Sequence, residues 1–355
     1  MKVAVTGGGT LGHIVPGIAV ANKLKKHGCD VFWIGNTDSD EKSYVQKRGI
    51  NFFSVSAGKL KRYFAFSNFI MPFLVIKGFF QARRILGQQK PDVLFSKGGF
   101  VSVPVARAAF SLGIPVVTHE SDSSCGLATR IIARYCDVVC LGDRRCSIST
   151  KAKVRYTGNP VRSDISGGNP QKFRRLHGIC DGMPTVLVLG GSQGALKLNN
   201  AIIDGMDRLR GRCNVILQSG KGKTTKTVIS GLWQFESFDD DFKDVLSLAD
   251  LVVSRAGAGA IAELQFLAKP MLLVPLGLDA SRGDQITNAE EALRKGKAVV
   301  VTDYDKVIEK ILELIDNEEK RELLYMACKA DQGMDSAEEI AQNVMEVATD
   351  GSECS

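Results

Sequence analysis

The chain carries one pattern twice, and this repeat limits the folds open to it more than any other feature. In the first half an apolar run leads into residues 7–10 (GGGT), and residues 92–99 (DVLFSKGG) follow later. In the second half an apolar run leads into residues 190–192 (GGS), and residues 250–257 (DLVVSRAG) follow. Because each copy combines strands with glycine-rich turns, we predict two similar doubly wound domains.

Short β-branched runs alternate with helical patterns in both halves, which is typical of parallel sheets covered by helices. We expect strands at residues 3–6, 31–34, 93–96, 116–118, 138–141, 186–189, 215–217, 251–254, 272–274 and 299–301. Glycine and proline residues interrupt regular structure between 158 and 171, which indicates the linker. The predicted class is α/β, with domains at 1–160 and 161–335 and a final helical segment, 336–355, expected to pack back on the first domain.

Composition narrows the class of protein without identifying a partner. Hydrophobic residues make up 44% and charged residues 24% of the 355 residues, and the net charge of +7 favours phosphates or an anionic membrane without indicating nucleic acid. The nine cysteines are odd in number and include no Cys-x-x-Cys pair, so we expect mostly reduced thiols. The chain opens directly in an apolar strand and lacks the roughly 20 apolar residues of a spanning helix. We therefore expect a cytosolic protein whose membrane contact is peripheral.

The first glycine-rich loop, residues 7–12, fits the pattern G-x-G-x-x-G. Backbone amides and the positive end of a helix favour an anionic ligand at such a loop. A dinucleotide-binding fold uses the same pattern, but it places an acidic residue about 20 positions on to hold a ribose. The second strand here ends at Asn36, and Asp38 comes late, which argues against a dinucleotide. Tight turns for close packing are the alternative for either loop alone, and the repeat weakens that alternative.

Two polar residues of the second half have more than one interpretation. Glu263 lies on an expected helix after residues 255–259, where its carboxylate could accept hydrogen bonds from a ribose or simply suit the helix dipole. Gln285 could bind sugar hydroxyl groups or cap the helix that begins near Ile286. The residues alone leave both questions open.

Several short motifs occur in a fixed order along the chain. They are residues 8–16 (GGTLGHIVP), 98–102 (GGFVS), 119–120 (HE), 158–162 (GNPVR), 190–195 (GGSQGA), 254–258 (SRAGA) and 284–289 (DQITNA). In these motifs the chain resembles the MurG family of glycosyltransferases, from the first strand to about residue 301. The resemblance implies a GT-B fold, in which two Rossmann-like doubly wound domains face a cleft. The donor would lie in the second domain and a lipid-linked acceptor on the first.

The resemblance also implies a reaction. UDP-N-acetylglucosamine (UDP-GlcNAc) would donate its sugar to undecaprenyl-pyrophosphoryl-MurNAc-pentapeptide, turning lipid I into lipid II with inversion, at the cytoplasmic face of a bacterial plasma membrane. Helix-start amides and a guanidinium would stabilise the departing diphosphate, so no cofactor and no metal are expected. A GT-B transferase with another acceptor, a sugar-nucleotide epimerase and a binding protein without turnover remain as alternatives.

The resemblance assigns donor contacts residue by residue. Ser192 and the amides of its loop would hold the diphosphate, and Arg162 would stand beside the donor. Glu263 would take the ribose hydroxyls, the backbone near Asp239 would read uracil, and Gln285 would bind the N-acetylglucosamine hydroxyls. The full expected donor-binding set is Thr10, Leu11, Gly12, Arg162, Ser192, Gln193, Asp239, Ala258, Gly259, Glu263 and Gln285.

The reaction needs a base for the acceptor hydroxyl, and we expect His13, because an imidazole titrates near neutrality. Glu120 and Asp122 complete the expected catalytic set, with His119 as a rival at the end of a parallel strand. The departures from the family pattern are Leu11 and Val103, where glycine is usual, and Ser121–Asp122, where Gln-Asn is common. The last change leaves the acceptor and base assignments in that loop open, and Asp122 could itself act as a carboxylate base.

Residues 59–84 interleave basic and apolar side chains, a pattern suited to the headgroup boundary of an anionic bilayer. The expected membrane residues are Phe69, Phe73, Lys77 and Phe80. Phe73, Ile76 and Phe80 could instead face the core, and we favour a mixed arrangement in which part of the segment is buried and the rest faces the membrane. Nucleic-acid binding is a further alternative, which nothing else supports.

The acidic triplet at residues 239–241 superficially offers a metal site. Acidic residues also suit the start of a helix, and a helical pattern begins at Phe242. We therefore interpret the triplet as a helix start.

Overall fold

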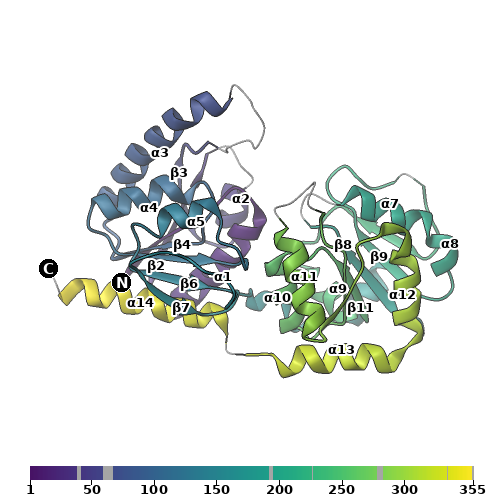
Figure 1. The fold of residues 1–355 in the computed structure, drawn as a ribbon. Helices are drawn as coiled ribbons and strands as arrows, with labels where there is room; N and C mark the ends of the chain where they lie inside the picture. Colours follow the sequence, from purple (N-terminus) through teal and green to yellow (C-terminus); the bar gives the residue numbers. More distant parts are fainter. Residues whose placement is uncertain are drawn as a thin grey trace. The chain divides into compact units, whose positions relative to one another are not determined.

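The computed structural model describes residues 1–37, 41–58, 67–191, 195–225, 227–277, 283–333 and 335–353, with side chains described outside 67–71 and 351–353. The chain forms two compact units (Figure 1). The first comprises Met1–Arg162 together with Met334–Ser355, and the second comprises Ser163–Gly333. Each unit is an α/β sandwich built around one parallel sheet.

The sheet of the first unit has seven strands within the described residues. Their order is β3 (Asn51–Val55), β2 (Asp30–Asn36), β1 (Lys2–Thr6), β4 (Val93–Ser96), β5 (Val116–Glu120), β6 (Val138–Leu141) and β7 (Lys153–Tyr156). All neighbours pair in parallel. Successive strands run outward in opposite directions from the β1–β4 pair, so the strand order reverses there, which is where open parallel sheets bind their ligands.

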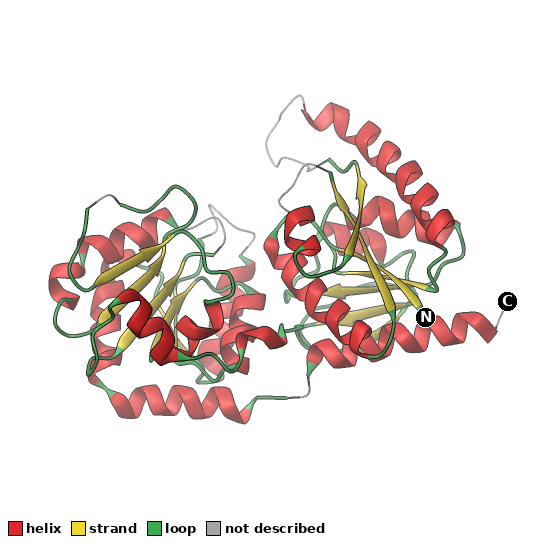
Figure 2. Ribbon diagram, turned by 180° about the vertical axis from the view of Figure 1, so that it is seen from behind, coloured by secondary structure: helices red, strands yellow, loops and turns green. Residues whose placement is uncertain are grey.

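Helices cover both faces of this sheet (Figures 1 and 2). They are α1 (Leu11–Lys26), α2 (Glu41–Gln46), α3 (Ser67–Gln89), α4 (Ser102–Ser111), α5 (Leu127–Ile132) and α14 (Ser336–Glu353). Side chains of a strand alternate between faces, so Val3 and Val5 pack with α1 and α14 while Ala4 packs with α3 and α4. The two apolar cores therefore lie on opposite sides of one sheet.

The sheet of the second unit repeats this plan, with six strands in the part of the chain that is described. Their order is β10 (Leu232–Phe235), β9 (Asn214–Gln218), β8 (Thr185–Leu189), β11 (Leu251–Ser254), β12 (Met271–Leu273) and β13 (Ala298–Val300). All are parallel, and the order reverses between β8 and β11. The remaining elements are η1 (Ser163–Ile165), α6 (Pro170–His177), α7 (Leu196–Asp204), α8 (Met206–Leu209), α9 (Phe242–Leu248), α10 (Ala258–Phe266), α11 (Asp284–Arg294), η2 (Tyr304–Lys306), α12 (Val307–Asp316) and α13 (Glu318–Ala330).

The last helix, α14, follows the second unit in sequence but packs on the first. Ile340 and Val344 are fully buried in the core that α14 shares with α1 and the sheet. At the start of the helix, Lys23 of α1 forms ion pairs with Asp335 and Glu338. Burial and charge together hold this helix against the first unit.

The prediction of two parallel α/β sheets is confirmed, and a strand lies at each of the ten expected places. Three strands, β3, β7 and β10, were not expected, and each lies at an edge of its sheet. An edge strand is covered less completely than a central one, so its sequence is less apolar; in β7, three of four residues are exposed. The helix expected from Phe242 is confirmed as α9.

Candidate active site

The loops after β1, β4 and β5 meet at the carboxyl edge of the first sheet. Their glycines are required by space and by backbone conformation: a Cβ atom on Gly7 would lie 2.8 Å from the Cβ of Lys97. Gly9, Gly98 and Gly99 have φ angles of +99°, +84° and +86°, a region that side chains rarely adopt. The glycine pattern therefore brings two backbone segments together at the point where the strand order reverses.

His13 lies in the first turn of α1, at this junction. Its Nδ1 atom is 3.0 Å from Oγ1 of Thr10, the residue before the helix. A Cβ atom built on Gly99 would be 3.5 Å from Cδ2 of His13, so the imidazole lies against the backbone of the β4 loop. Thr10 and Gly12 are exposed and Leu11 is half-buried against the core. The β1 loop and the first turn of α1, which hold these expected residues, therefore lie against the β4 loop.

Glu120, at the end of β5, accepts hydrogen bonds from the loop that follows it. Oε1 accepts from the backbone nitrogens of Ser121 at 2.9 Å and Asp122 at 3.3 Å. Oε2 accepts from the nitrogen of Gly126 at 3.0 Å and from Oγ1 of Thr129 at 2.6 Å. Since four donors converge on this carboxylate, it organises residues 121–129, and Asp122 is held half-buried within that loop.

His119 is completely buried beside Glu120. Its Nε2 atom donates to the carbonyl oxygen of Gly158 at 2.9 Å. Burial, reinforced by the nearby Lys97 ammonium, places the pKa of His119 well below its ordinary value. The imidazole is therefore neutral near pH 7 and joins β5 to the segment that leads out of the first unit.

Lys97 is the functional candidate that sequence reasoning missed. It follows β4 directly, is 2% exposed, and donates from Nζ to Oγ of Ser121 at 2.9 Å. Burial lowers the pKa of Lys97 to about 8, against the opposing effect of the Glu120 and Asp122 carboxylates. In the sequence it is only a lysine between Ser96 and Gly98, and this position gave no signal of its burial.

The second unit presents its own loops where β8 and β11 diverge. Ser192 and Gln193 lie outside the described residues. After β11, Gly257 precedes α10 in an extended conformation, and Ala258 and Gly259 are the first two residues of that helix. Helix α10 therefore begins with small residues that allow a ligand to approach its amides.

Glu263 and Gln285 lie on α10 and α11 of this unit. Glu263 is half-buried in the second turn of α10. Gln285 lies in the first turn of α11, and its Oε1 accepts from the nitrogen of Leu276 at 3.0 Å. Gln285 thus shapes the loop after β12 rather than capping its own helix.

Two further side chains fix the loops around these positions. Arg255 donates from Nη1 to the carbonyl of Val274 at 2.9 Å and to the hydroxyl of Tyr304 at 2.7 Å. Asn288 donates from Nδ2 to the carbonyl of Ala256 at 3.2 Å. The loop after β11 is consequently tied to both the loop after β12 and helix α11.

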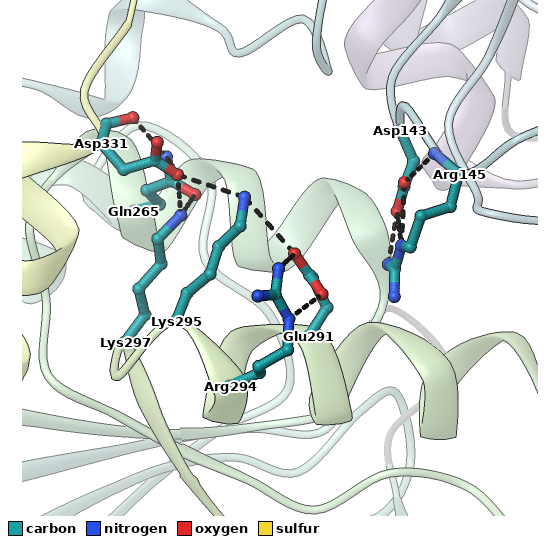
Figure 3. A network of polar contacts seen from close by, with 8 residues as sticks. All are labelled: Asp143, Arg145, Gln265, Glu291, Arg294, Lys295, Lys297 and Asp331. Atoms are coloured by element: carbon teal, nitrogen blue, oxygen red, sulfur yellow. Dashed lines mark hydrogen bonds and ion pairs between the residues drawn. The ribbon is translucent and has the colours of Figure 1, made fainter.

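A polar network holds the C-terminal ends of α10 and α11 (Figure 3). Lys297 bonds both Asp331 and Oε1 of Gln265, the latter at 3.0 Å. Lys295 reaches Asp331 at 3.6 Å and Glu291 at 3.5 Å. The network fixes the two helices on which Glu263 and Gln285 stand.

The remaining expected residues lie at loop positions. Arg162 is half-buried and is the last residue of the first unit's leading segment. Asp239 is exposed between β10 and α9, and its backbone nitrogen donates to Oδ1 of Asp241 at 3.1 Å. Among the described residues, no cluster of three or more His, Cys, Asp or Glu side chains is arranged to hold a metal ion.

Comparison with known proteins places the chain in a family. Residues 3–141 match the glycosyltransferase family 28 N-terminal domain, and residues 185–344 match the glycosyltransferase family 28 C-terminal domain. A UDP-N-acetylglucosamine–N-acetylmuramyl-(pentapeptide) pyrophosphoryl-undecaprenol N-acetylglucosamine transferase of Clostridium tetani is 42% identical over 326 residues, or 90% of this chain and 91% of the relative. The chain belongs to glycosyltransferase family 28, as a MurG-type member.

Solved structures resemble this family 28 glycosyltransferase over nearly its whole length. MurG of Acinetobacter baumannii matches with a TM-score of 0.72 and 24% identity, covering 97% of this chain and 99% of the other. UDP-GlcNAc 2-epimerase of Neisseria meningitidis matches with a TM-score of 0.69 and 14% identity, covering 99% and 100%. These likenesses show the GT-B fold, which transferases and epimerases share.

Proposed function

We propose that this family 28 glycosyltransferase transfers N-acetylglucosamine from UDP-GlcNAc to undecaprenyl-pyrophosphoryl-MurNAc-pentapeptide, converting lipid I to lipid II in peptidoglycan synthesis. The observation that carries the proposal is the 42% identity, over nine-tenths of the chain, to a transferase named for this donor and acceptor. The junction of the β1, β4 and β5 loops supports it, because a half-buried histidine and a carboxylate-organised loop lie where a parallel sheet places its ligand.

In this proposal the second unit binds the donor. Glu263 binds the ribose hydroxyls, the amides that open α10 at Ala258 and Gly259 face the diphosphate, and Gln285 binds the sugar. Ser192, Gln193 and the backbone at Asp239 complete the donor contacts of this unit, and the further donor-binding candidates Thr10, Leu11, Gly12 and Arg162 belong to the first. The departing diphosphate then accepts hydrogen bonds from these groups, which stabilise its charge without a metal.

The first unit binds the acceptor and takes its proton. His13 acts as the base that accepts the proton of the acceptor's C4 hydroxyl as the oxygen attacks the anomeric carbon, and the contact with Thr10 orients the ring. Asp122 is the second candidate base. Glu120 acts as a positioning residue, because its oxygens already accept four hydrogen bonds from its own loop.

We further propose that α3 rests on an anionic membrane at the cytoplasmic face. Phe73 and Phe80 are 73% and 63% exposed, and Lys77 between them is exposed on the same side of the helix. The alternative that Phe73, Ile76 and Phe80 face the core is wrong, because these side chains are 73%, 54% and 63% exposed. Ala82 and Leu86 of the same helix face the core instead. The side chain of Phe69 lies outside the described part. No described helix is both long and apolar enough to cross a bilayer.

The test is release of uridine diphosphate from UDP-GlcNAc with and without a short-chain lipid I analogue, in the presence of a chelator. We expect release that depends on the acceptor and survives chelation. His13→Ala should lose at least 100-fold in kcat while donor affinity stays unchanged, in the range for loss of a general base. The control is His27→Ala, a histidine at the opposite end of α1. No acceptor-dependent release would rule out the transferase proposal.

A further inference from the structure

Lys97 places an ammonium group inside the first unit. Its backbone nitrogen donates to the carbonyl of Thr6 at 2.7 Å, so the residue continues the sheet one step past β4. Hypothetical Cβ atoms on Gly7 and Gly17 would lie 2.8 Å and 3.6 Å from the Cβ of Lys97. The β1 loop and α1 therefore enclose the side chain, which is 2% exposed.

The groups around this ammonium come from the loop after β5 and from its strand. Nζ donates to Oγ of Ser121 at 2.9 Å, and the carboxylates of Glu120 and Asp122 both favour its charged form. The charge of Lys97 also lowers the pKa of His119, which is neutral. Across the β4 loop, the imidazole of His13 lies against Gly98 and Gly99, the next two residues after Lys97.

Burying a charged amine is costly, and an apolar side chain would fill the same space without that cost. An apolar side chain could not donate to Ser121, nor could it offset the carboxylates of Glu120 at the end of β5 and of Asp122 in the loop after it. Glu120 fixes the backbone of this loop through its hydrogen bonds, whereas Lys97 contacts a side chain and supplies the opposite charge. The two residues thus hold different parts of the same loop.

We propose that Lys97 is a positioning residue of the transfer reaction, which holds Ser121 and balances the charge of Asp122 so that the 121–126 loop keeps the shape that receives the acceptor. The proposal deepens the proposed function and rests on it. Lys97 contacts no substrate itself in this arrangement, because the surrounding loops cover its side chain.

The test compares Lys97→Met and Lys97→Arg with Lys269→Met. Lys269 is a matched control, since it is also largely enclosed but donates to the carbonyls of Ser247 and Ala249 in the second unit. Lys97→Met should lower kcat/KM for the acceptor at least tenfold and leave KM for UDP-GlcNAc within twofold. Lys97→Arg should restore part of the loss, and Lys269→Met should change neither kcat/KM for the acceptor nor KM for UDP-GlcNAc.

A purely structural role would not move the pH profile. Removing a positive charge makes neighbouring acids release their protons less readily, so the acid limb of kcat/KM should move up by about one pH unit in Lys97→Met. In Lys97→Met/Asp122→Asn the two losses should be less than additive, because the charge that Lys97 balances is already gone. Full activity with an unmoved acid limb would overturn the proposal.

Two further measurements keep the outcome clear. If Lys97→Met does not fold, Ser121→Ala takes its place, and unchanged acceptor kcat/KM in that variant would overturn the proposal. Hydrogen exchange of residues 121–126 needs no turnover, and it should speed up in Lys97→Met but not in Lys269→Met. If the native chain shows no acceptor-dependent release, the proposed function fails, and the exchange experiment still decides whether Lys97 positions the loop.

Discussion

Arg155 on β7 donates two hydrogen bonds to the carboxylate of Glu346 on α14, from Nη1 to Oε2 at 2.7 Å and from Nη2 to Oε1 at 2.6 Å. Nη1 also donates to Oδ1 of Asn343 at 2.5 Å. These bonds fasten β7, one of the edge strands that the sequence did not predict, to the last helix. Because both side chains of the ion pair are partly exposed, the pair contributes little compared with the apolar contacts beneath it.

The first prediction concerns those apolar contacts. Ile340→Ala should lower the free energy of unfolding of the first unit by about 3 kcal/mol, since it opens a cavity in a fully buried site. Arg155→Ala should cost less than about 1 kcal/mol. The chain's two tryptophans, Trp33 and Trp233, stand in different units, so fluorescence of a Trp233→Phe background reports the first unit alone.

Ile311→Ala is the mirror control for this experiment. Ile311 is fully buried on α12 of the second unit, so its loss should shift the transition reported by Trp233 in a Trp33→Phe background. Equal effects of Ile340→Ala and Arg155→Ala on the Trp33 signal would contradict the dominance of apolar burial.

The second prediction concerns pH. The folded pKa of His119 lies well below the unfolded value of about 6.5, so below pH 6.5 the unfolded chain binds a proton that the folded chain does not. The neutral histidine thus contributes stability above that pH, and about 1.4 kcal/mol is lost for each pH unit below it. The free energy of unfolding of His119→Asn should be lower than that of the native chain at pH 7.5, and this difference should become smaller toward pH 5.5. If denaturant titrations gave the same difference in unfolding free energy at both pH values, the lowered pKa of His119 would be contradicted.

The third prediction concerns thiols. Burial raises the pKa of Cys140 to about 12 and of Cys328 to about 11, so neither forms the reactive thiolate at pH 8. Cys180 is exposed and should be alkylated at least 100 times faster than either. Peptide mass spectrometry after brief treatment with iodoacetamide measures this order, and denaturant should abolish it. Early labelling of Cys140 in the native chain would show that the first core opens.

The fourth prediction concerns the membrane. Phe73→Ser/Phe80→Ser should weaken binding to phosphatidylglycerol vesicles at least tenfold, because each change removes an exposed aromatic ring from the α3 surface. The control is Leu176→Ser/Leu293→Ser, which removes side chains of 70% and 52% exposure from the second unit. Sedimentation with vesicles measures both. Equal loss in the two variants would argue against α3 as the contact surface.

Sequence reasoning recovered the central strands because they are apolar on both faces, and it recovered the glycine loops because few other residues allow such backbone angles. It could not recover β7, whose residues 153–156 (KVRY) show an edge strand's mixed character. Nor could it show which groups bind the Glu120 carboxylate, because Thr129, one of its donors, comes from the next helix.

The burial of Lys97 is another feature that could not be predicted from the sequence. In the sequence it is a lysine between Ser96 and Gly98, and lysines are rarely buried. Only the enclosure by the β1 loop and α1 reveals an internal ammonium group. Burial of a charge results from tertiary packing, so no local pattern could predict it.

The return of α14 to the first unit has a consequence for synthesis of the chain. A ribosome finishes the second unit, residues 163–333, before it makes the helix that completes the first. Throughout that interval, the sheet face bearing Val3, Val5 and Val93 lacks the cover that Ile340 and Val344 later give it. The nascent first unit thus exposes an apolar surface that chaperones can bind, and its folding ends only after release of the last helix.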